Sequence, residues 1–79
     1  MNEIDATGLT CPMPVLRLQR KLRAVDKGTQ LTLLASDPMA AIDVPHFCSQ
    51  GGHKLIAQSQ EKGGAPGGAD LLVFKIEKR

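Results

Sequence analysis

The sequence contains no tryptophan and no tyrosine, and aromatic residues make up only 3 % of it. This composition excludes a platform of aromatic side chains on which the bases of a single-stranded nucleic acid stack. No apolar run approaches the roughly 20 residues needed to span a bilayer. Residues 1–5 are acidic rather than basic and apolar, unlike the start of a signal peptide. We therefore expect a cytoplasmic protein with no membrane contact.

Cysteine is also scarce, with only Cys11 and Cys48 present. In a reducing compartment, two cysteines are expected as free thiols rather than as a disulfide. His46, Cys48 and His53 do not follow the spacing of zinc ligands, so we expect no metal ion. We also expect no cofactor. The net charge of +2 is too small to define a nucleic-acid-binding protein by itself.

The length of 79 residues fits one domain over residues 1–79 and leaves no room for a second. A domain of this size buries roughly 60 % of the surface that its unfolded chain exposes, so its core is thin. A deep substrate pocket is therefore not expected. We expect the chemistry to take place at the surface, within reach of a partner protein.

The sequence predicts two helices and four strands. After Pro14, apolar residues recur every three or four positions, which predicts a helix with one buried stripe that ends near Gly28. Asp37 as the N-cap and Pro38 at the first helical position predict a second helix, in which Pro45 should cause a kink. Alternating or apolar runs predict strands at residues 4–6, 31–35, 54–60 and 70–77.

The order β-α-β-α-β-β predicts an α/β fold, a two-layer sandwich with both helices on one face of a mixed four-stranded sheet. In such units each helix begins beyond the carboxyl end of the strand before it, so Cys11 and Asp37 should share one edge of the sheet. If the third strand runs parallel to the first two, the glycine-rich loop at residues 62–68 reaches the same edge.

Cys11 is the candidate for chemistry. Pro12 is favoured at the first helical position, which places Cys11 at the N-cap. Free backbone N–H groups and the positive end of the helix dipole favour the reactive thiolate there, and an anionic persulfide gains in the same way. Pro12 and Pro14 donate no hydrogen bonds, but they stiffen the first turn and hold Cys11 outward. This local pattern alone leaves open whether Cys11 is a reactive thiol or an inert small residue.

A longer stretch around Cys11 resembles a known family. Residues 5–14, Asp-Ala-Thr-Gly-Leu-Thr-Cys-Pro-Met-Pro, are similar to the signature of the TusA-like (SirA-like) sulfur carriers, in which a Cys-Pro-x-Pro box opens the first helix. The similarity continues through Asp37 and Pro38 and through residues 43–48, and it covers nearly the whole chain in order and length. The box together with its lead-in, which includes Gly8, is a specific signature.

The resemblance implies a fold and a role. The fold is a two-layer α/β sandwich similar to the C-terminal domain of a translation initiation factor. The role is that of a sulfurtransferase-like carrier rather than a stand-alone enzyme. Cys11 would accept sulfane sulfur as a persulfide from a donor such as a cysteine desulfurase and pass it to a downstream acceptor protein. Gly8, Pro12, Pro14 and Asp37 are expected to support Cys11.

The resemblance also bears on the end use of the sulfur. In well-known members the relay ends in the 2-thiouridine of tRNA, and others are tied to sulfur oxidation or to molybdenum-cofactor enzymes. Met13 stands where the tRNA-thiolation members typically have an acidic residue, and Ile42 stands where a basic residue often precedes the acid that matches Asp43. The glycine-rich loop is also longer than in the compact members. These departures leave the carrier chemistry intact and the partners open.

The first helix carries a basic face formed by Arg17, Arg20 and Lys21. Besides being a solvated surface, this face is a candidate for docking an acidic partner through electrostatic steering, with RNA contact secondary. Two other functions stay open: an RNA- or protein-binding module that uses this face, and a redox sensor based on Cys11 and Cys48. Cys48 lies on the apolar side of the second helix, where a buried packing thiol is the simpler expectation.

Overall fold

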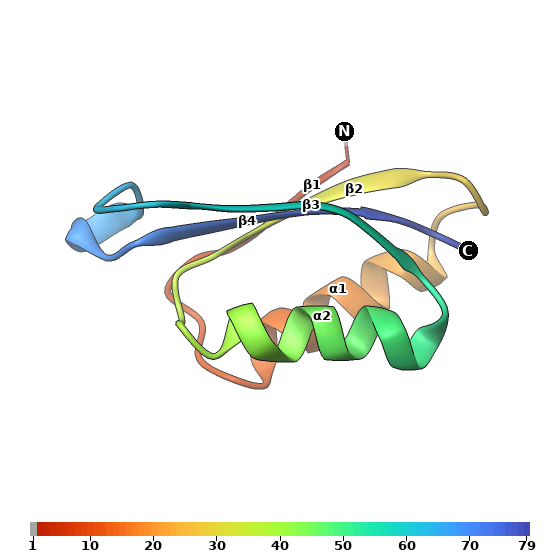
Figure 1. Cartoon of the computed structure of the whole chain (residues 1–79), viewed down its shortest axis with the longest axis horizontal. Helices are drawn as coiled ribbons and strands as arrows, with labels where there is room; N and C mark the ends of the chain where they lie inside the picture. Colours follow the sequence, from red (N-terminus) through yellow and green to blue (C-terminus); the bar gives the residue numbers. More distant parts are fainter. Residues whose placement is uncertain (1) are drawn as a thin grey trace.

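The computed structural model of the chain describes residues 2–79 and shows an α/β sandwich of two layers (Figure 1). Both helices lie on the same face of the four-stranded sheet, which confirms the predicted fold class. The strands begin and end within one residue of their predicted limits. The elements are β1 (Glu3–Ala6), α1 (Met13–Arg23), β2 (Gln30–Ala35), α2 (Ala40–Gly51), β3 (Lys54–Glu61), the 3-10 turn η1 (Pro66–Gly68) and β4 (Leu71–Glu77).

The sheet has the strand order β1-β2-β4-β3. β1 pairs with β2 in parallel, and β4 is antiparallel to both of its neighbours, so β3 runs parallel to β1 and β2. The carboxyl ends of these three strands therefore point the same way. The loops that follow them, residues 7–12, 36–39 and 62–70, lie at the same end of the molecule (Figure 1). The glycine-rich loop thus reaches the predicted edge.

The core lies between the sheet and the helices. Buried apolar residues alternate with exposed or half-buried residues along β2 and β4. Leu33 of β2 pairs with Phe74 of β4 near the centre of this ladder. Phe74 is the largest fully buried side chain, so the thin core depends heavily on one aromatic ring. The helices contribute Leu18 and Leu22 from α1, and Ala40, Val44 and Cys48 from α2.

Both helices begin later than the sequence indicated. Pro12 occupies the N-cap of α1, so the prediction that Cys11 is the N-cap is wrong by one residue. Met39 occupies the N-cap of α2, because a tight turn with a hydrogen bond from Ala40 N–H to the Asp37 carbonyl precedes the regular helix. Pro45 lies inside α2, which continues through it to Gly51. Neither helix within residues 2–79 has the length and apolar character needed to cross a membrane.

Candidate functional site

Cys11 lies in the loop between β1 and α1, and its thiol is free and exposed. The other cysteine differs from Cys11 in exposure. Cys48 is 2 % exposed, packs into the core from α2, and has its thiol pKa raised by burial. The prediction that Cys48 is a buried packing residue is confirmed. Cys11 is therefore the one of the two thiols that a partner protein reaches.

The loop before Cys11 is held in a defined shape. The Asp5 carboxylate accepts hydrogen bonds from the Thr7 N–H at 3.0 Å and from the Thr7 hydroxyl at 2.6 Å. Gly8 has φ +80°, a left-handed conformation that favours glycine, and its N–H donates to the Ser36 hydroxyl oxygen at 2.8 Å. This last bond ties the β1–α1 loop to the β2–α2 loop. Gly8 thus fixes the path of the chain toward Cys11.

Asp37 connects the same two loops next to the thiol. One carboxylate oxygen accepts from the Cys11 N–H at 2.7 Å, and the other accepts from the Met39 N–H at 3.1 Å. These two bonds lower the pKa of Asp37, and the bond from Cys11 has the larger effect. The proximity of Asp37 to Cys11 is confirmed, and it is a contact with the backbone of Cys11 rather than with the sulfur. Asp37 therefore carries a fixed negative charge beside the thiol.

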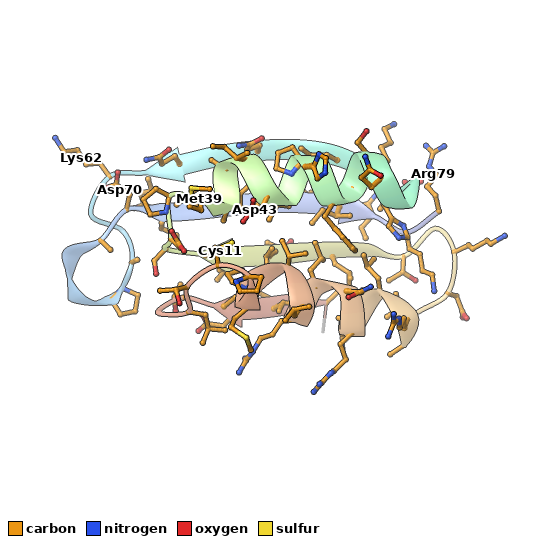
Figure 2. The ribbon with its side chains drawn as sticks, turned by 90° about the horizontal axis from the view of Figure 1, so that it is seen from below. Cys11, Met39, Asp43, Lys62, Asp70 and Arg79 are labelled. Carbon is orange, nitrogen blue, oxygen red and sulfur yellow. The ribbon has the colours of Figure 1, made fainter. Side chains whose placement is uncertain are left out.

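A second carboxylate contacts the sulfur itself. The Cys11 thiol donates a hydrogen bond to a carboxylate oxygen of Asp43 at 2.7 Å. Figure 2, which views the molecule from the helix side, shows Asp43 on α2 beside Cys11. This hydrogen bond raises the pKa of the Cys11 thiol, and desolvation and the negative charges of Asp43 and Asp37 raise it further. The hydrogen bond and the two carboxylates thus disfavour the thiolate form of Cys11.

The expectation that the helix N-terminus favours a thiolate at Cys11 is therefore wrong for this structure. Pro12 and Pro14 have no N–H, and the Met13 N–H already donates to the Thr10 carbonyl at 2.8 Å. Few amides remain to stabilise an anion, while two carboxylates oppose one. Asp43 was missed as a site residue because it lies 32 positions from Cys11 and only the packing of α2 brings it there. The stretch at residues 43–48 included it without suggesting a role.

A shallow apolar groove of about 360 Å³ extends from the thiol between α1 and α2. It is open to solvent, in keeping with the expectation that a domain of this size has no deep pocket. Its lining is mostly apolar. The lining residues are Cys11, Pro12, Val15, Asp43, His46, Phe47 and Gln50.

The predicted basic residues line a different depression. Arg17, Arg20 and Lys21 face the edge strand β1, where they border a hollow of about 440 Å³ together with Glu3 and Asp5. The Arg17 guanidinium donates to the Asp5 carbonyl at 3.3 Å. These basic side chains are therefore not part of the groove beside Cys11. Whether they bind a partner stays a prediction.

Large apolar side chains are exposed near the N-terminal ends of both helices. Met13 on α1 is 44 % exposed, and Met39 and Ile42 at the start of α2 are 46 % and 64 % exposed. Figure 2 shows Met39 at the same end of the molecule as Cys11 and Asp43. Exposed apolar groups gathered near a reactive group indicate a protein interaction surface. Within residues 2–79, no three side chains of His, Cys, Asp or Glu are grouped so as to hold a metal ion.

Comparison with known proteins supports the resemblance seen in the sequence. A family model described as Sulfurtransferase TusA matches residues 2–66. The Sulfur carrier protein TusA of Pseudomonas syringae pv. syringae (strain B728a) is 44 % identical over 61 residues, which are 77 % of this chain and 73 % of the relative. The Sulfur carrier protein TusA of Pseudomonas aeruginosa (strain LESB58) is 45 % identical over 60 residues, 76 % of each chain.

The fold also matches a solved structure. The crystal structure of a SirA-like protein from Desulfitobacterium hafniense superimposes with a TM-score of 0.67 over 95 % of this chain and 96 % of that chain. At 21 % sequence identity, this match speaks for the fold alone. It agrees with the two-layer arrangement of helices and sheet described above.

Proposed function

This chain belongs to the TusA family, and from this premise we propose that it is a sulfur carrier that holds sulfur as a persulfide on Cys11. We also propose that residues 1–79 form a single carrier domain. The observation that carries the proposal is the exposed Cys11 thiol at the edge of the sheet, beside an apolar groove. Gly8 and Asp37 support it, because Gly8 ties the loop before Cys11 to Ser36 and Asp37 accepts the N–H of Cys11 itself.

The transfer that we propose conserves atoms and electrons. A donor persulfide, R–S–SH, reacts with the Cys11 thiolate at its outer sulfur. The sulfur–sulfur bond of the donor breaks, a new one forms to Cys11 Sγ, and the donor leaves as a thiolate that is protonated to R–SH. The net reaction turns Cys11–SH into Cys11–S–SH without an oxidant, a reductant or a cofactor. A second exchange with an acceptor thiol returns Cys11 to its starting state.

Two protein partners follow from this reaction. The donor is a cysteine desulfurase or another persulfide-bearing protein, and the acceptor is the next protein of the relay. The exposed Met13, Met39 and Ile42 support docking at the end that bears Cys11. Arg17, Arg20 and Lys21 would steer an acidic partner toward α1. The end use of the sulfur is tRNA 2-thiouridine synthesis or another branch of sulfur metabolism.

The test is loading of the intact protein with sulfur. The chain is incubated with a cysteine desulfurase and cysteine, and its intact mass is measured without reducing agent. We expect a gain of one sulfur atom in the native protein and in Cys48→Ala, and no gain in Cys11→Ala. Sulfur loading that persists in Cys11→Ala, or no loading of the native protein by any tested donor, would refute the proposal.

The alternative functions have less support. A redox sensor needs Cys11 and Cys48 to meet, and the Cys48 side chain is almost completely buried in the core. A binding module that uses the basic face predicts that Arg17→Glu with Arg20→Glu abolishes function while Cys11→Ala leaves it intact. The loading experiment and these variants distinguish a sulfur carrier from a binding module.

A further inference from the structure

The surroundings of Cys11 are negatively charged and contain no balancing cation. Asp43 accepts the thiol hydrogen bond, and Asp37 accepts the N–H of the same residue. In the part of the chain that the structure describes, the one ion pair joins Arg79 and Glu77. Figure 2 shows Arg79 at the far end of the molecule from Cys11. Neither carboxylate beside the thiol is neutralised by a lysine or an arginine of the described chain.

This arrangement is unusual for a reactive cysteine. Reactive thiols generally lie next to cations or to free amides that stabilise the thiolate. Here Pro12 and Pro14 remove two N–H groups from the start of α1, and that of Met13 is already used. On the α1 side, only Pro12 before the helix and Val15 within it line the groove beside the thiol. On the α2 side, the titratable groups are Asp43 and His46. The geometry therefore disfavours the thiolate, which is the reactive form of a cysteine, in the free protein.

We infer that Asp43 gates Cys11: its carboxylate keeps the thiol protonated in the free protein, and a sulfur donor that places a cationic side chain against Asp43 releases the thiolate in the docked complex. The inference rests on the proposed function. Asp43 is half-buried and lines the solvent-open groove, and its neighbour Ile42 is 64 % exposed, so a docked protein reaches both. Asp43 thus makes the reactivity of Cys11 depend on the charge of its partner.

The gate adds one proton transfer to the sulfur exchange. The bonds formed and broken in the exchange stay the same. The proton leaves Cys11 Sγ for solvent when the cation of the donor pairs with Asp43. The thiolate attacks the outer sulfur of the donor persulfide, and the departing donor thiolate takes a proton from solvent. After the donor leaves, the Asp43 carboxylate lies close to an anionic persulfide and disfavours it. This repulsion favours passing the sulfur on.

The gate is tested first on the free protein. The rate of Cys11 alkylation by iodoacetamide is measured against pH for the native chain and for Asp43→Asn, with peptide mapping to separate Cys11 from Cys48. We expect the midpoint of the profile to shift to lower pH in the variant. A shift of one pKa unit would raise the rate near neutral pH about tenfold. Asp26→Asn removes the same charge from an exposed position outside the groove and should leave the profile unchanged.

A second measurement compares two sulfur donors, glutathione persulfide and a persulfide-loaded cysteine desulfurase. The gate predicts that Asp43→Asn speeds loading by the small molecule several-fold and does not speed loading by the protein. An unshifted alkylation profile overturns the gate, and slower loading by the protein donor alone would then make Asp43 a docking contact. If neither donor loads the native chain, the proposed function fails, while the alkylation profile still decides whether Asp43 controls the thiol.

Discussion

Replacement of Gly8 by alanine tests whether the loop shape before Cys11 matters for its chemistry. Gly8 has φ +80°, and a Cβ built there meets nothing within 4 Å. The cost of Gly8→Ala is therefore conformational rather than steric, about 1–2 kcal/mol for a left-handed backbone. The stiffer unfolded chain offsets about 0.4–1 kcal/mol of this cost. We expect a net loss of roughly 1 kcal/mol in the free energy of unfolding.

The chain offers a matched control in Gly67, which has the same φ of +80° and equally open surroundings. Gly67→Ala should lose a similar amount of stability, measured by urea unfolding followed with circular dichroism because the sequence has no tryptophan or tyrosine. Only Gly8→Ala should also slow sulfur loading, since relaxing φ weakens the bond from the Gly8 N–H to Ser36. Equal loading rates in the two variants would show that Gly8 affects stability alone. An unchanged stability in both would refute the conformational reasoning.

Three further predictions concern the core, the acid response and the basic face. Phe74→Ala should lower the free energy of unfolding by about 3–5 kcal/mol in urea titrations, because Phe74 is completely buried, whereas the exposed Lys75→Ala should change it little. The N–H groups of Cys11 and Met39 lower the pKa of Asp37 in the folded protein below its ordinary value of 3.8. The ionised carboxylate therefore stabilises the fold fully above pH 3.8, and this stabilisation is lost as the pH falls through the lower pKa of the folded state. Asp37→Asn should therefore flatten the dependence of stability on pH in acid, and an unchanged slope would contradict these bonds. The double variant Arg17→Glu with Arg20→Glu should slow sulfur loading from an acidic protein donor by about tenfold at low salt. It should leave loading by glutathione persulfide unchanged. An equal effect on both donors would argue against electrostatic steering.

Much of the fold is readable from the sequence because its elements have clear periodicity. Leu31, Leu33 and Ala35 alternate with half-buried residues in β2, and the same period in β4 buries Leu72, Phe74 and Ile76. The connections between strands and helices are short, so handedness leaves few topologies to choose from. The shared edge of Cys11 and Asp37 follows from that topology, and the bond between them agrees with it.

The chemical environment of Cys11 is not readable in the same way. The contact between Cys11 and Asp43 depends on how α2 is rotated and how closely it packs against α1, and neither is set by local pattern. The sequence shows that Pro12 and Pro14 lack N–H groups, yet their effect on the thiol depends on which other amides are free. In the structure, the N–H groups of Met13 and Leu16 are already used, by the carbonyls of Thr10 and Pro12. The position of Cys11 just before a helix is thus predicted by the sequence, while the main influence on its pKa comes from Asp43 on another element.

The persulfide on Cys11 is tested most directly by following labelled sulfur onto and off that residue. The chain is loaded from a cysteine desulfurase with radioactive cysteine sulfur, digested without reducing agent and mapped by peptide, and a second sample is chased with an excess of an acceptor thiol. We expect one sulfur on the peptide that contains Cys11, none on that of Cys48, and loss of the label during the chase. Label on Cys48, or label on Cys11 that no thiol removes, would contradict a carrier.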